Sequence, residues 1–150
     1  MGTRAVYTFS DTAESYHVYK HWDGYPEGAA MWLVQGLAYA WKLPRFEADE
    51  MACAFIAGNK KLHTGGDVRL LSTGPIDQVA PSDIEYWYEV FQAPNGQLIV
   101  KAWAVENWTK WTAHVVFYGR LADFAEKHDP EAYALYRLMY PSTSKLKVAA

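Results

Sequence analysis

The chain has 150 residues, a formal net charge of −3, one cysteine and an unusually high aromatic content of 16%. The length suits one domain, the acidic balance argues against a nucleic-acid-binding surface, and the lone cysteine excludes an intramolecular disulfide. The N-terminus lacks the apolar core of a signal peptide, and no stretch reaches the roughly 18 apolar residues of a membrane span. We therefore expect a soluble, cytoplasmic protein that engages neither nucleic acid nor membrane.

The first half of the chain predicts a β-hairpin and then two helices. Apolar alternation predicts strands over residues 4–9 and 15–21, joined by a polar turn. A helix is expected to begin near Pro26 and to end before Pro44, and a second to cover residues 47–61. The expected buried stripe of the first helix is Val34, Leu37, Ala38 and Trp41, and that of the second is Ala48, Ala52, Phe55 and Ile56.

The second half predicts four strands and then two helices. Its clearest signal is the Asn95-Gly96 turn between two alternating segments, which indicates a β-hairpin. A proline-containing loop is expected over residues 73–83. The predicted strands cover residues 67–72, 84–91, 97–105 and 111–118, and the predicted helices cover 121–128 and 130–140, the last with the stripe Ala132, Leu135, Tyr136 and Met139.

This order, β-β-α-α-β-β-β-β-α-α, predicts an α+β fold. Consecutive hairpins favour an antiparallel sheet of about five or six strands, with the helices packed on one of its faces. No repeat, linker or low-complexity tract divides the chain, so residues 1–150 are expected to form a single domain, with residues 142–150 as a loose C-terminal tail.

The most distinctive segment, residues 20–28, has the sequence KHWDGYPEG and joins a strand end to a helix start. In one interpretation His21 and Asp23 are an acid–base pair or bind a ligand; in the other the segment is a structural turn. The guanidinium of Arg4 is expected to bond Asp23 and to fix that turn. The candidate ligand-binding or motif residues are Arg4, His21, Trp22, Asp23 and Tyr25.

The start of the chain and this segment together resemble a loosely defined group of small proteins from phages, prophages and bacterial mobile elements. Its members begin with a Gly-Thr-Arg-Ala-like strand, here residues 2–5, and carry a His-x-Asp-Gly-Tyr-Pro-x-Gly segment, here residues 21–28. The resemblance covers roughly the first forty residues. It implies an accessory protein of a phage or mobile element and names no reaction. The shared positions are Arg4, His21, Asp23, Gly24, Tyr25 and Pro26.

Four tryptophans form a second candidate site. Trp87 and Trp103 fall on neighbouring predicted strands, on the face opposite the regular apolar alternation, where they can pair across the hairpin. Trp108 and Trp111 belong to the link that follows. Either helices cover this face, or it is an aromatic surface for a protein partner, a second copy or a planar ligand.

Other chemistry has little support in the sequence. The histidines lack metal-ligand spacing, and no nucleophile elbow, phosphate loop or dinucleotide fingerprint is present. Cys53 is expected to be a buried thiol in the second helix. We therefore predict no metal and no cofactor.

Three classes of function remain open. We favour a non-enzymatic accessory protein that binds a host protein or sequesters a small molecule. The alternatives are a small enzyme that uses His21 and Asp23 as its acid–base pair, and a structural or assembly protein that forms homo-oligomers through its aromatic face.

Overall fold

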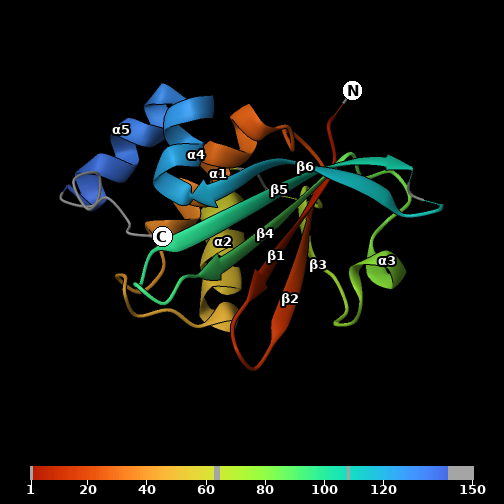
Figure 1. The fold of residues 1–150 in the computed structure, drawn as a ribbon, viewed down its shortest axis with the longest axis horizontal. Coiled ribbons are helices and arrows are strands. Elements are labelled where there is room, and N and C mark those ends of the chain that lie inside the picture. Colours follow the sequence, from red (N-terminus) through yellow and green to blue (C-terminus); the bar gives the residue numbers. More distant parts are fainter. Residues whose placement is uncertain (1, 63–64, 108, 142–150) are drawn as a thin grey trace.

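The computed structural model describes residues 2–62, 65–107 and 109–141 and has an α+β fold (Figure 1). The hairpins and helices expected from the sequence are present. The elements, in chain order, are β1 (Ala5–Ser10), β2 (Ser15–Lys20), α1 (Pro26–Leu37), α2 (Ala48–Leu62), β3 (Val68–Leu70), α3 (Ile76–Val79), β4 (Tyr86–Gln92), β5 (Leu98–Asn107), β6 (Thr112–Arg120), α4 (Leu121–His128) and α5 (Pro130–Met139).

The six strands form one sheet in the order β3-β2-β1-β4-β5-β6. Four neighbouring pairs are antiparallel, as expected, and β1 and β4 are parallel, so the six-stranded sheet is mostly antiparallel with one parallel pair. A parallel pair needs a long crossover between its strands. Here α1, α2 and β3 lie between β1 and β4 in the chain and provide that crossover.

The four longer helices of the described chain lie on one side of the sheet, which we call the inner face (Figure 1). Helix α1 is central and contacts α2, α4 and α5. It ends at Leu37, earlier than predicted, so Ala38 is exposed and Trp41 lies beyond the helix. The reason is a tight last turn, in which the amides of residues 38–40 bond carbonyls three residues back.

Helix α2 packs against α1 as its apolar stripe predicts. A Cβ on Gly36 would lie 3.0 Å from the Cα of Phe55, so the glycine permits the close approach of the two helices. Cys53 is exposed, and the prediction of a buried thiol was wrong, because its position turns to the solvent side of α2.

The other side of the sheet, the outer face, has much less cover. The segment 71–84, which includes the short helix α3, packs over Val6 and Tyr19 with the side chains of Ala80 and Ile84. Part of this segment is therefore helical, where the sequence predicted only a loop. Within the described residues, no helix combines the length and the apolar character that crossing a membrane requires.

Candidate functional site

The first candidate site, the turn after β2, is held by a residue that sequence analysis missed. The Asp67 carboxylate accepts hydrogen bonds from the Lys20 ammonium at 2.7 Å and from the backbone amides of His21 and Trp22 at 3.2 and 3.0 Å. Lys20 and Asp67 have only 0% and 5% of their side chains exposed. Burial lowers the pKa of Lys20, and the Asp67 carboxylate opposes that shift. The ion pair therefore fixes the start of the motif.

Gly24 and Gly28, the two glycines of residues 20–28, allow neighbouring atoms to pack closely against the turn. A Cβ on Gly24 would lie 2.7 Å from the Cβ of Ala5 and 2.7 Å from the carbonyl oxygen of Thr3, and one on Gly28 would lie 2.2 Å from the carbonyl oxygen of Asp23. The Tyr88 hydroxyl also donates a hydrogen bond to the Gly24 carbonyl at 2.5 Å. Only residues without a Cβ fit at these two points.

Arg4 does not fix this turn through Asp23, and that prediction was wrong. Its Nε lies 2.9 Å from the Oδ2 of Asp83. The cause is the parallel pairing of β1 and β4, because the amide of Glu85 bonds the Arg4 carbonyl at 2.8 Å and brings Asp83 alongside.

The structure does not join His21 and Asp23 as an acid–base pair. The His21 Nδ1 lies 2.9 Å from the Tyr19 hydroxyl, whereas the Asp23 carboxylate accepts a 3.4 Å hydrogen bond from the Tyr25 hydroxyl. The Asp23 charge raises the pKa of Tyr25. Trp22 and Tyr25 are 46% and 39% exposed. Among the described residues, no hydrogen bond or ion pair connects the two proposed catalytic groups, and the contacts of the motif are those of a structural junction.

In the second candidate site, the predicted pairing of Trp87 with Trp103 is confirmed. Trp87 and Trp103 are direct partners on β4 and β5, and their rings stack at 5.5 Å between centroids with an interplanar angle of 22°. Trp111 meets Trp87 edge-on at 5.9 Å. Trp108 lies outside the described residues.

A hydrogen-bond relay that the sequence did not predict anchors this cluster. The Trp87 indole donates to the Thr8 hydroxyl at 2.8 Å, Thr8 lies 2.7 Å from the Nδ1 of His17, and the His17 Nε2 lies 2.7 Å from the Gly74 carbonyl. A carbonyl only accepts, so the His17 Nε2 donates to Gly74, and in that tautomer the Nδ1 accepts a hydrogen bond from the Thr8 hydroxyl. The relay thus ties the segment 71–84 to the sheet.

Beyond that segment the outer face is open over β4, β5 and β6 (Figure 1). Tyr118 is 63% exposed and Val115 is 42% exposed. The Lys101 ammonium lies 4.6 Å from the ring centroid of Trp103 and 5.5 Å from that of Tyr118. We call this surface the outer aromatic face; it comprises Glu89, Phe91, Lys101, Trp103, Val115 and Tyr118.

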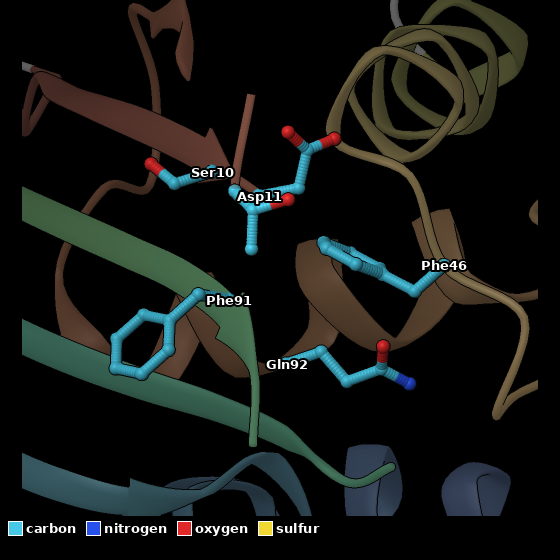
Figure 2. Close-up of a pocket in the computed structure, with 6 residues that line it drawn as sticks. Ser10, Asp11, Phe46, Phe91 and Gln92 are labelled. Atoms are coloured by element: carbon cyan, nitrogen blue, oxygen red, sulfur yellow. The ribbon is translucent and has the colours of Figure 1, made fainter. Parts of the chain in front are cut away.

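A hollow of about 360 Å³ lies next to this face, between the end of β1, the loop before α2 and the end of β4. Figure 2 shows Phe46 reaching into it from the loop, opposite Ser10 and Asp11, with Gln92 below. Two of its polar groups, the Asp11 carboxylate and the Gln92 side-chain nitrogen, already bond the backbone. The two Asp11 carboxylate oxygens accept the amides of residues 13, 14 and 48 at 2.8–2.9 Å, and the Gln92 amide donates to the carbonyls of residues 44 and 96. Phe91 lines both the hollow and the outer aromatic face.

Comparison of the chain with known protein families, curated proteins and solved structures gives no match. In the part of the chain that the structure describes, no three His, Cys, Asp or Glu side chains gather where they could hold a metal ion. The geometry of the chain itself therefore carries the functional argument, and the outer aromatic face is the most distinctive surface described.

Proposed function

We propose that this chain is a non-enzymatic binding protein, a cytoplasmic accessory factor of a phage or mobile element, and that its outer aromatic face docks a host protein. The observation that carries the proposal is that Tyr118, Val115 and the partly exposed Trp103 share the part of the outer face that lies beyond the segment 71–84, where no described helix covers the sheet. Contiguous exposed apolar surface of this kind marks interaction sites, and tyrosine and tryptophan are enriched at the centre of protein interfaces.

The contacts favour docking of a host protein over an enzyme and over sequestration of a small molecule. An enzyme based on His21 and Asp23 has no supporting contact between those side chains. A small-molecule site needs free polar groups to orient its ligand. The carboxylate of Asp11 and the side-chain amide of Gln92, the strongest polar groups of the 360 Å³ hollow, already bond the backbone. A protein surface needs neither a catalytic pair nor an enclosed cavity.

Affinity capture from a bacterial host extract, followed by reconstitution with the purified partner, tests this proposal. We expect Tyr118→Ser to weaken the reconstituted complex by about tenfold or more, as truncation of an aromatic anchor does. The matched control is Leu138→Ser, because Leu138 is 81% exposed on α5, away from the outer face. Equal affinities of the wild type and Tyr118→Ser for the partner would contradict the proposal. So would a loss of affinity in Leu138→Ser without a loss in Tyr118→Ser.

A further inference from the structure

We propose that the host protein docks as an extended segment, which adds a strand to the free edge of β6 beside residues 117–120 and carries acidic side chains towards Lys101 and Lys127. The inference rests on the proposed function, because it names the kind of partner that this surface takes and how that partner is held. Addition of a strand gives affinity through main-chain hydrogen bonds and specificity through the side chains on either side.

The edge of the sheet at β6 is long and uncovered. In the strand order of the sheet, β6 is the last strand and pairs only with β5, so one side of its backbone has no neighbouring strand in the part of the chain that the structure describes (Figure 1). Strand β6 has nine residues, none of which is buried, whereas the opposite edge, β3, has three. Short strands, prolines and lysines protect edges from pairing with other chains, and β6 has none of these protections. A backbone edge of this kind is complementary to an extended chain.

A bulge locates the docking stretch on this edge. Strands β5 and β6 pair in regular register over residues 117–120, and Val116 then has no partner on β5. A bulge bends a strand and interrupts its pairing, so the regular stretch of the edge ends at residue 117. Within that stretch Tyr118 lies on the outer face and is 63% exposed, whereas Phe117 lies on the inner face against Phe124. An added strand therefore contacts an aromatic ring on each face.

A lysine flanks the docking stretch on each face. The Lys101 ammonium lies 5.5 Å from the ring centroid of Tyr118 on the outer face, and the Lys127 ammonium of α4 lies 5.8 Å from the ring centroid of Phe117 on the inner face. Neither lysine forms an ion pair among the described residues. Consecutive residues of a strand point to opposite faces, so two adjacent acidic residues in the added strand can reach both ammonium groups.

Two acidic side chains near this stretch have other partners. Glu89, the cross-strand partner of Lys101, accepts a hydrogen bond from the Trp103 indole at 2.8 Å. The Asp123 carboxylate accepts hydrogen bonds from the Arg120 guanidinium at 2.7 and 2.8 Å. The two lysines are therefore open to carboxylates from another chain.

The same charges argue against a segment of this chain as the occupant. Residues 112–120, which a second copy would place beside β6, contain no acidic side chain and carry the cation Arg120. Residues 142–150 contain Lys145 and Lys147 and no acidic side chain. We therefore assign the edge to a segment of a different protein, with β-branched residues that suit a strand and adjacent acidic residues that complement the lysines.

Synthetic peptides test the proposal on the full chain. The probe is the acetylated and amidated peptide TVEEVTV, and the backbone amide NMR signals of the protein follow its binding. We expect saturable binding at millimolar concentration or below, with the largest shifts in residues 117–120. The peptide TPEEPTP has the same charge and should not bind, because proline has no amide hydrogen to donate to a strand. Equal binding of the two peptides, no saturable binding of TVEEVTV, or shifts confined to other parts of the chain would overturn the proposal.

Charge reversal tests the two lysines. Lys101→Glu and Lys127→Glu should each weaken the binding of TVEEVTV at least about tenfold, and the double variant should bind the basic peptide TVKKVTV more tightly than the wild type does. The matched control is Lys61→Glu on α2, because the Lys61 ammonium also lies 5.8 Å from the centroid of an aromatic ring, that of Tyr39. Thermal unfolding confirms that each variant is folded. Unchanged affinity of Lys127→Glu for TVEEVTV overturns the proposal, as does an equal loss in Lys61→Glu.

The outcomes also distinguish this inference from the proposed function. A host protein whose affinity falls with Tyr118→Ser but not with Lys127→Glu docks without pairing to β6, which overturns the inference and leaves the host-binding proposal intact. Binding of TVEEVTV at β6 without capture of any host protein supports the inference and overturns the host-binding proposal. A wild-type dimer that TVEEVTV dissociates would make a second copy the occupant of the edge and overturn the inference.

Discussion

The two faces of the sheet are built from the same strands and differ in what covers them. On β4, Tyr88 and Val90 point to the inner face and are 0% and 1% exposed, whereas Trp87 and Phe91 point to the outer face and stay partly exposed. Both faces are rich in aromatic rings. Helices α1, α2 and α4 cover the first, and of the described segments only 71–84 covers part of the second. An aromatic side chain therefore stabilises the fold or remains available for binding according to the element placed over it.

Both faces also bury a polar group, with different partners. The inner face has the Lys20–Asp67 ion pair, and the outer face has the relay through Thr8 and His17. Each polar group ties a connecting segment to the sheet. The inner pair joins two oppositely charged groups, so its disruption should cost more than disruption of the outer relay of hydrogen bonds.

The largest expected effect is that of Asp67→Ala. It leaves the Lys20 ammonium buried without its partner and removes the acceptor of two backbone amides, so we expect a loss near the upper end of about 3–5 kcal/mol in unfolding free energy. Urea unfolding measures it. The double variant Lys20→Met with Asp67→Asn should recover most of the loss, because no buried charge remains and the amides keep an acceptor. A double variant as unstable as Asp67→Ala would contradict this explanation.

A matched pair of phenylalanines compares the faces directly. Phe55 on α2 is fully buried against Tyr7 and Phe9, so Phe55→Ala should cost about 3–4 kcal/mol. Phe91→Ala on the outer face of the monomer should cost less than about 1 kcal/mol, because the ring is already partly exposed. Urea unfolding under conditions where the chain is monomeric checks both. Similar losses would mean that the outer face is packed as tightly as the inner one.

Thr8→Val tests the relay beneath the segment 71–84. It removes the acceptor of the Trp87 indole and the partner of His17, so we expect a loss of about 1–2 kcal/mol. In Thr8→Val, hydrogen exchange should become faster, relative to the wild type, in the segment 71–84 and not in β5. The control is Ser10→Ala, which removes a surface hydrogen bond to Ser15 and should change little. Unchanged exchange in the segment would show that the relay does not hold it.

The smallest expected effect is the pH dependence contributed by Asp11. Hydrogen bonds from the amides of Ala48, Glu14 and Ala13 lower the pKa of Asp11. Its carboxylate therefore stabilises the fold above the unfolded-state pKa of about 3.9, and this contribution disappears as the pH falls through the lower folded-state pKa. Solvent screens this partly exposed group, so the contribution should be below about 1 kcal/mol.

Melting temperatures of the wild type and Asp11→Asn between neutral pH and about pH 2.5 test this contribution, since the window lies below the unfolded-state pKa of about 3.9. The two curves should differ most at neutral pH and converge in acid. Parallel curves would show that Asp11 has the same pKa in the folded and unfolded chains.

Local signals in the sequence were enough for much of the fold. The Asn95-Gly96 turn, the proline at the start of α1 and the stripe Ala132, Leu135, Tyr136 and Met139 each depend on neighbours within a few residues, and the corresponding elements formed. The pairing of Trp87 with Trp103 was also predictable, because a short hairpin fixes its own register.

The prediction that was wrong and the residue that was missed both depended on contacts between segments far apart in the sequence. Arg4 was assigned to Asp23, nineteen positions along the chain, but the parallel pairing of β1 with β4 brought Asp83 to it instead. Asp67 was missed as the anchor of the turn because only the β2–β3 pairing places it beneath Lys20.

The sequence by itself determined the α+β class, the positions of most elements and which residues each strand presents on either side, because alternation, helical spacing and turn chemistry act over a few residues. Only the tertiary structure decided which face the helices would cover. That choice depends on how the helical crossover between two parallel strands lies against the sheet, and no local pattern records it. The same crossover left Trp103 and Tyr118 on the open side, where a partner can reach them.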